Sequence, residues 1–196
     1  MNTCKPNIKN NSSCNPLVAG STHPNLNSVV LSYLEYCQPR LEAQLRTFAD
    51  EATLTTAIVR AALAQTRDGK RYSHQRRIML QVLQAVRLRL LVLDLGKLCS
   101  FDELIIAIDR AIAPIRGVGE LLVYDTSLRI GAKLRLMPDR VYLHSGTRHG
   151  ARVLGLPWRG RSISLDELPV AFRVLKPHEI EDCLCIFKDQ LSTLTP

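Results

Sequence analysis

An all-α fold is expected for this chain of 196 residues, and three observations favour it. Apolar residues recur at three- and four-residue spacing over several long stretches, which is typical of helices with one buried face. Ser-x-x-Glu sequences at Ser100 and Ser164 match the capping box that begins many helices. Strand patterns are scarce, and the best candidate is the short segment 140–144. With 46% hydrophobic residues, the chain is long enough for one well-cored domain, expected at 28–196, and one extension.

The first part of the chain predicts a tail followed by three helices. Residues 1–27 are rich in Asn, Ser and Pro and have few apolar side chains, so they are expected to form a flexible tail. Helix-length patterns then cover 28–48, 51–65 and 73–95. The turn signal Asp68-Gly69 separates the last two.

The helix that begins at Ser100 has the clearest signals. Its serine oxygen is expected to accept the N–H of Glu103, whose carboxylate returns to the cap. One buried face then follows, made of Leu104, Ile105, Ile108, Ala111 and Ile112. Pro114 ends or kinks this helix. Pro177 begins a last helix, which extends to about residue 191, at a position where its missing N–H costs nothing.

A glycine-containing turn lies between two expected helices at Ile115-Arg116-Gly117-Val118-Gly119. The order hydrophobic-x-Gly-hydrophobic-Gly between helices is the helix-hairpin-helix pattern, here at about 100–136. Two glycines allow positive φ and a close approach of the backbone to a ligand, and the N–H groups that begin the next helix favour an anion. Such a hairpin holds a DNA phosphate without reading bases. The open alternative is a packing corner between two helices.

This pattern resembles the helix-hairpin-helix superfamily of base-excision DNA glycosylases. The resemblance covers 50–155 in the order of the helices, and its specific part is 115–134. It implies a DNA-glycosylase-like helical domain and double-stranded DNA as the partner. The expected DNA contacts of the hairpin are Arg116, Gly117, Val118 and Gly119.

Two departures concern the catalytic residues of that superfamily. Some members have a lysine just after the second glycine, where this chain has Glu120. A catalytic aspartate follows about twenty residues later; Asp139 lies near that distance, but the segment most like the catalytic one ends in His144. The cysteine pattern of an iron–sulfur cluster is absent from the sequence. Catalysis is therefore not assigned, and Asp125, Asp139 and His144 stand as its candidates.

Charge is concentrated in two blocks of a chain whose net charge is +8. Segments 60–90 and 129–161 each carry eight Lys or Arg against one Asp, so each has a charge of +7. Such blocks suit a polyanion, because each phosphate that is neutralised releases counterions. Arginine predominates, and its planar group holds a phosphate with two hydrogen bonds. The alternative is solvated helix faces whose aliphatic stems cover apolar surface.

Two further segments are candidates for phosphate contact. In segment 143–155, Thr147 is expected to cap a helix on whose first turns Arg148 and Arg152 stand, beside His149. The basic loop 67–77 is suited to backbone contacts, through Lys70, Arg71, Arg76 and Arg77, with stacking by Tyr72. Trp158 is expected in a surface loop, where it either stacks on a base or covers the core.

Asp125 lies in an apolar run and has two interpretations. Arg129 follows it by four residues, in the favourable order for a side-chain ion pair on a helix. A partly buried carboxylate with a raised pKa, acting as acid or base, is the alternative. The ion pair is the favoured interpretation, because Arg129 is at hand.

The six cysteines predict neither disulfides nor a metal site. The first residues lack the apolar centre of a secretory signal, so free thiols in a reducing, cytoplasmic setting are expected. Cys183 and Cys185 would point to different sides of a helix and cannot together chelate one ion. No cofactor is expected. No apolar run reaches the length of a membrane span, so no membrane contact is expected.

Three hypotheses about function follow. The first is a protein that binds duplex DNA through backbone phosphates, independently of sequence. The second is a divergent base-excision glycosylase or lyase. The third is a protein-interaction module with an acidic partner, in which the hairpin is only a corner.

Overall fold

The computed structural model describes residues 25–194. Within them the chain forms nine α-helices, four short 3-10 helices and one two-stranded sheet, so the expected all-α character is confirmed. The α-helices are α1 (Leu26–Tyr36), α2 (Gln38–Ala49), α3 (Leu54–Ala62), α4 (Leu80–Leu91), α5 (Phe101–Ile112), α6 (Glu120–Leu134), α7 (Ser145–Val153), α8 (Pro177–Ile186) and α9 (Lys188–Leu191). The 3-10 helices are η1 (Ser73–Gln75), η2 (Leu95–Lys97), η3 (Leu165–Glu167) and η4 (Val170–Val174).

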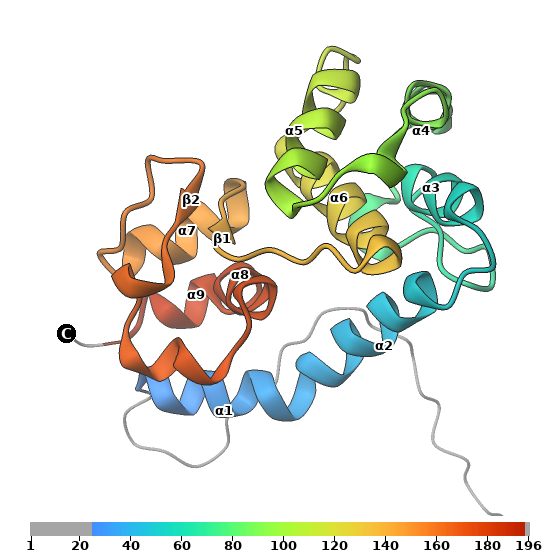
Figure 1. Cartoon of the computed structure of the whole chain (residues 1–196). Coiled ribbons are helices and arrows are strands. Elements are labelled where there is room, and N and C mark those ends of the chain that lie inside the picture. Colours follow the sequence, from blue (N-terminus) through green and yellow to red (C-terminus); the bar gives the residue numbers. More distant parts are fainter. Residues whose placement is uncertain (1–24, 195–196) are drawn as a thin grey trace, which may run out of the picture.

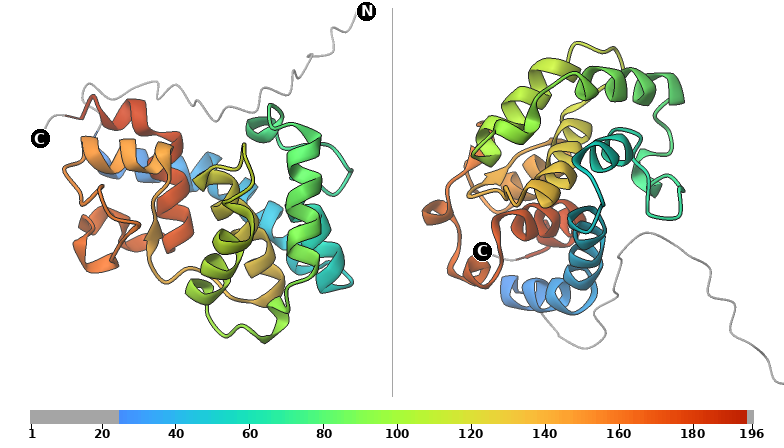
Figure 2. Two further views of the ribbon diagram at one scale, coloured as in Figure 1. Left: turned by 90° about the horizontal axis from the view of Figure 1, so that it is seen from above. Right: turned by 45° about the vertical axis from the view of Figure 1, so that its right-hand side comes forward.

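The helices are arranged in two lobes, each with its own hydrophobic core (Figure 1). The first lobe contains α3 to α6 and the end of α2, packed around buried Phe48, Leu83 and Leu104. The second lobe contains α1, the sheet and α7 to α9, packed around Phe172 and Phe187. Figure 2 shows the same division from above. The helices α1 and α2 run along one side of the molecule and connect the second lobe to the first, and the segment between α6 and β1 returns to the second lobe (Figure 1).

The predicted helix 28–48 is wrong as a single element, because it is divided at Cys37 into α1 and α2. Pro39 lies in the first turn of α2, where its ring and its missing N–H would have broken a continuous helix. The expected tail is also too long. Residues 25–27 belong to α1 and its cap, since Asn25 Oδ1 accepts the N–H of Ser28 at 2.9 Å. The rest of that tail lies outside the described residues.

The predicted helix 73–95 begins too early. Residues 73–75 form η1, and α4 begins only at Leu80. The intervening turn is closed by tertiary contacts: Arg71 Nη1 donates to the carbonyl of Ile78 at 2.5 Å, and buried Gln75 accepts a bond from Arg129 in α6 at 2.9 Å. These contacts override the helical tendency of the segment.

The cap of α5 is confirmed in part. Ser100 Oγ accepts the N–H of Glu103 at 3.1 Å. The Glu103 carboxylate, however, accepts from the N–H of Cys99 at 2.8 Å and not from that of Ser100. Leu104, Ile108 and Ile112 are fully buried, as expected.

The strand and helices predicted for the second lobe are present, but they are shorter than predicted. The strand candidate 140–144 forms β1 (Val141–Tyr142), which pairs antiparallel with β2 (Ser162–Ile163). The Ser164 signal begins only the one-turn η3, where the Ser164 N–H donates to the Glu167 carboxylate at 2.9 Å. The last helix is divided at Phe187 into α8 and α9. None of the helices in residues 25–194 has the length and apolar character that crossing a membrane requires.

Candidate functional site

The hairpin 115–119 is a tight, exposed turn between α5 and α6. Gly117 has φ +98°, which favours glycine, and a Cβ there would lie 3.3 Å from Val82 Cγ2. Gly119 has φ −116° and open space around it, so the expectation that both glycines have positive φ is wrong for Gly119. Val118 packs against the core of the first lobe, as predicted. Arg116 is exposed.

Glu120, on the first turn of α6, points toward the second lobe and forms an ion pair with Arg148 of α7. The guanidinium also donates to the carbonyl of Gly160 at 3.5 Å. The carboxylate is thus partly neutralised beside the hairpin. Because Arg148 is paired with Glu120, a phosphate at this place would compete with the Glu120 carboxylate for the Arg148 guanidinium.

Thr147 is not a helix cap, and the prediction that it contacts phosphate is wrong. The N-cap of α7 is His144, whose Nδ1 accepts the N–H of Gly146 at 3.3 Å. Thr147 is fully buried, and its hydroxyl donates to Glu181 Oε1 at 2.9 Å. Arg152 remains exposed, 3.4 Å from the ring of His149.

The basic loop 67–77 is partly occupied by internal contacts. Lys70 pairs with Asp68 at 2.8 Å, and Arg71 is held by the backbone of Ile78. The ring of Tyr72 is covered by the guanidinium of Arg129, 4.2 Å from its centroid, so stacking of Tyr72 on a base through that face is excluded. Arg76 and Arg77 are exposed.

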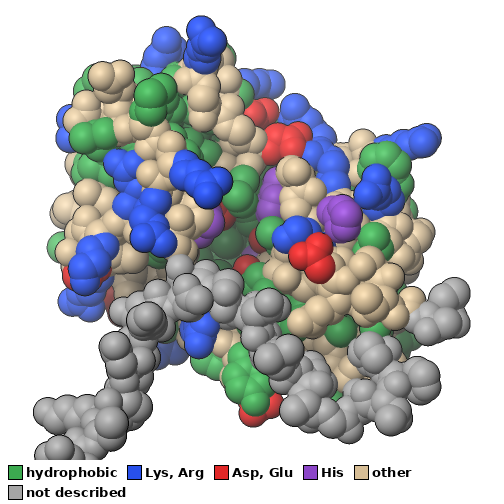
Figure 3. Space-filling view, turned by 180° about the vertical axis from the view of Figure 1, so that it is seen from behind, with side chains coloured by type: hydrophobic (Ala, Val, Ile, Leu, Met, Phe, Trp, Pro, Cys, Tyr) green, Lys and Arg blue, Asp and Glu red, His purple; other side chains and the backbone are tan. Residues whose placement is uncertain are grey.

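A pocket of about 560 Å³ lies between the two lobes, and we name it the interlobe pocket. Leu121, Asp125 and Leu128 line it from one face of α6, at helical spacing that begins two residues after the hairpin. The other wall is formed mainly by α8, through Glu181, Asp182 and Cys185. Figure 3 shows the hollow between the lobes, with acidic and histidine side chains in view and basic ones to both sides. The pocket thus brings together two of the three catalytic candidates, Asp125 and His144.

The first-lobe wall holds a charged network around Asp125. Its Oδ2 lies 2.7 Å from His74 Nε2 and 3.1 Å from Arg129 Nη2. Arg129 is 1% exposed and extends the network to Gln75. Burial would raise the pKa of Asp125, but Arg129 and His74 outweigh it and hold that pKa below its usual value. The predicted ion pair is confirmed, and the alternative of a raised pKa is wrong.

The second-lobe wall holds a second network around Glu181. Its carboxylate contacts the ring of His144 and accepts the hydroxyl of Thr147. Burial lowers the pKa of His144, but the hydrogen bond and the charge of Glu181 outweigh it, so the pKa is raised. Next to it, burial and the charge of Glu181 raise the pKa of Asp182 to about 8. Tyr33 of α1 donates to Asp182 at 3.2 Å.

The sequence interpretation missed Glu181 and Asp182, because both lie on α8, more than 35 residues from His144. In the sequence they appear only as two adjacent acidic residues between Ile180 and Cys183. Asp139, in contrast, is exposed in a turn and pairs with Arg140 at 3.0 Å, which lowers its pKa. It does not line the interlobe pocket, so the three candidates do not form one group.

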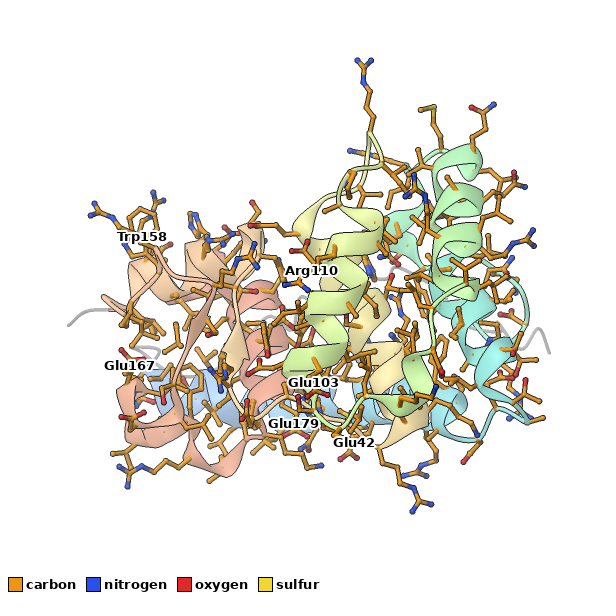
Figure 4. The ribbon with its side chains drawn as sticks, turned by 45° about the horizontal axis from the view of Figure 1, so that its top comes forward. Glu42, Glu103, Arg110, Trp158, Glu167 and Glu179 are labelled. Atoms are coloured by element: carbon orange, nitrogen blue, oxygen red, sulfur yellow. The ribbon has the colours of Figure 1, made fainter. Side chains whose placement is uncertain are left out.

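The other predictions concern the cysteines and Trp158. Cys183 is buried in the second core and Cys185 lines the interlobe pocket, so they point to different sides, as expected. Burial raises the pKa of Cys185 to about 12. Residues 25–194 contain no group of three or more His, Cys, Asp or Glu that could hold a metal ion. Trp158 packs against the second core, at the outer end of that lobe, beneath Arg159 (Figure 4).

Ion pairs of Lys176 with α2 and α8 also join the two lobes. Figure 4 shows Glu42 of α2 near Glu179 of α8, and Lys176 lies 3.3 Å from the first carboxylate and 3.5 Å from the second. Gln38 donates to Glu179 at 3.0 Å. The boundary between the lobes is therefore polar on this side.

No protein-family model matches this chain, and no match is found among curated proteins or solved structures. The geometry thus defines a mostly helical, two-lobed protein with a pocket between the lobes that ionisable side chains line.

Proposed function

We propose that this protein binds duplex DNA through its backbone phosphates, with little dependence on sequence. The observation that carries the proposal is the exposed hairpin 115–119, in which Gly119 has no neighbouring atoms in the way of a phosphate. Behind it α6 is 15 residues long, and the first N–H groups of such a helix have no partner within it. Arg116 adds a cation on the same turn.

The contact surface extends beyond the hairpin through exposed arginines on both lobes. Arg76 and Arg77 come from the first lobe, and Arg152 comes from the second. Basic side chains on both sides of the hollow would let a duplex contact both lobes (Figure 3). Thr147 and Arg71 are not part of the proposed surface, because their polar groups are used inside the protein.

The test is the affinity for a generic duplex, measured by fluorescence anisotropy over a salt series. Arg116→Ala is expected to reduce the slope of log K against log salt by about 1, which corresponds to one lost phosphate contact. Gly119→Ala is expected to weaken binding with an unchanged fold, because its methyl group would occupy the space of the phosphate. The controls are Arg173→Ala, an exposed arginine of η4, and Gly96→Ala, an exposed glycine of η2.

The proposal fails if wild-type protein does not bind, or if Arg116→Ala and Gly119→Ala bind as their controls do. In that case the hairpin is a packing corner. A duplex of unrelated sequence and equal length should bind within a small factor of the first.

A divergent base-excision glycosylase or lyase is the second candidate function. It is favoured by one observation, that Asp125 and His144 line the same pocket and that Leu121, two residues after the hairpin, lines it too. An ionised carboxylate beside a buried imidazole could stabilise a developing positive charge or move a proton. His144 contacts Glu181 in the wall of this pocket, which suits the second of these roles.

Duplexes that carry a panel of damaged bases would test this candidate, with abasic sites detected by alkaline strand cleavage. Excision is expected from wild-type protein and is expected to fall by at least 100-fold in Asp125→Asn. DNA binding by the same variant should be retained. Binding without cleavage of any duplex in the panel, in wild type, would leave the first function and reject the second.

A further inference from the structure

Helix α4 carries apolar side chains both toward the core and toward solvent. Its inner side carries Val82, Leu83, Val86 and Leu90, all buried in the first lobe. Large apolar side chains are exposed on its outer side and at its two caps: Met79 is 65% exposed, Leu80 52%, Leu88 61%, Leu91 39% and Val92 81%. We name this outer set the α4 stripe. Single exposed apolar residues are ordinary on protein surfaces, but a row of them on one helix is not.

Three residues of the stripe share one side of α4 because of their spacing. Leu80, Leu88 and Leu91 are separated by eight and three residues, and these intervals return to one side of an α-helix. Gln84 lies between them and is exposed. The row extends for about 17 Å, or three turns. Figures 1 and 2 show α4 at the outer edge of the first lobe, away from the second.

Positive charge flanks this stripe on both sides. Arg87 and Arg89 lie on either side of it at helical spacing. The chain has no Asp or Glu between Asp68 and Asp94. The Nε of Arg87 is buried and has no hydrogen-bond partner among the described residues. The surface therefore combines an apolar row with uncompensated cations.

We propose that the α4 stripe is a docking site for an amphipathic helix of another protein, with apolar residues at i, i+4 and i+7 flanked by Asp and Glu. Helix-in-groove and helix-on-helix recognition use this spacing, and opposite charges at the flanks set the orientation. The proposal does not depend on DNA binding, because none of the stripe residues belongs to the hairpin surface.

Charge excludes two other occupants. A second copy of α4 would place arginines against arginines, and like charges in contact are costly. Residues 1–24 of the chain contain Lys5 and Lys9 and no acidic residue, so they carry the wrong charge as well. An acidic helix satisfies both the apolar row and the arginines.

The experiment uses a labelled peptide of about 21 residues, made of three Leu-x-x-x-Leu-x-x heptads with Glu at the flanking positions, and fluorescence anisotropy with the full chain. Binding is expected, and a scrambled peptide of the same composition should bind at least tenfold more weakly. Leu80→Gln/Leu88→Gln should weaken binding at least tenfold. The matched control is Leu31→Gln/Val174→Gln, because these side chains are 65% and 67% exposed in the second lobe.

A charge reversal makes the test specific. Arg87→Glu/Arg89→Glu should lose the acidic peptide and gain a peptide in which Lys replaces Glu. Equal binding of the ordered and scrambled peptides, or equal binding by the stripe and control variants, overturns the proposal. Binding of the wild type to vesicles of phosphatidylcholine and phosphatidylglycerol but not to the peptide also overturns it, in favour of a membrane surface.

Discussion

Arg129 is the residue on which the wall of the interlobe pocket depends. Its guanidinium is 1% exposed and contacts Asp125, Gln75 and the ring of Tyr72. A buried charge is tolerated only with partners, and here three side chains from two segments contact the guanidinium, while its Nε has no hydrogen-bond partner among the described residues. The prediction of the Asp125–Arg129 pair was therefore correct. It did not include Gln75 and Tyr72, which lie more than 50 residues earlier in the chain.

Replacing Arg129 with Met is expected to destabilise the fold by about 3 kcal/mol, since Asp125 would lose its main buried counter-charge. Chemical denaturation at neutral pH measures this change. Lys97→Met is the control, because the Lys97–Asp94 pair at 2.7 Å is fully on the surface and such pairs contribute little. Equal losses of stability in the two variants would show that the buried charge of Arg129 does not stabilise the fold.

At the scale of elements, the hairpin shows which glycine the turn requires. Gly117 lies in the left-handed region, whereas Gly119 has an extended φ that any residue adopts. The sequence pattern contains both glycines but does not distinguish them. The distinction matters for function. The backbone of the turn does not require glycine at position 119, so the missing side chain of Gly119 can instead serve the close approach of a ligand.

Gly117→Ala is expected to destabilise the protein by about 1–2 kcal/mol, through its left-handed backbone and its contact with Val82. Gly119→Ala should leave the stability within about 0.5 kcal/mol of wild type. Denaturant midpoints at a common m-value compare the two variants. A larger loss of stability in Gly119→Ala than in Gly117→Ala would contradict the open space around Gly119.

The ends of the helices show which boundaries the local sequence can predict. Ser100 and its apolar face predicted α5 correctly, because the cap and the buried side depend only on neighbours in the sequence. Pro39 is a local signal for the break between α1 and α2. The late start of α4 had no local signal, since Arg71 and Arg129 hold the preceding turn from outside it.

At the scale of the whole molecule, the two lobes meet across ionisable groups, and the stability of the protein should depend on pH. Burial and the charge of Glu181 raise the pKa of Asp182 to about 8. A carboxyl with a raised folded pKa binds its proton more tightly in the folded state, so folding is favoured at low pH and loses stability as pH rises from about 4 to about 8. His144 acts in the same direction, because its folded pKa is also raised.

Wild-type protein is therefore expected to lose stability between pH 6.5 and pH 8.5, with a slope of up to about 1.4 kcal/mol per pH unit for each proton released. Below pH 6.5 buried His178, whose pKa is lowered to about 4, acts in the opposite direction. Asp182→Asn should flatten this dependence, since the amide retains an acceptor for Tyr33 and has no proton to lose. Asp189→Asn, at an exposed position of α9, is the control. Urea denaturation at several pH values gives the slopes, and an unchanged slope in Asp182→Asn would contradict the assignment.

The helical class, the turn between α5 and α6, the Asp125–Arg129 pair and the two basic blocks can be predicted from the residue pattern. These features depend on spacing within one element or on composition, which a linear pattern contains. The pattern does not contain the burial of Thr147, the pairing of Glu120 with Arg148, the separate place of Asp139, or the pocket that Asp125 and His144 line with Glu181 and Asp182. The reason is physical: these contacts join α6, α7 and α8 across two cores, and the packing of two lobes is not encoded in the period of any one helix.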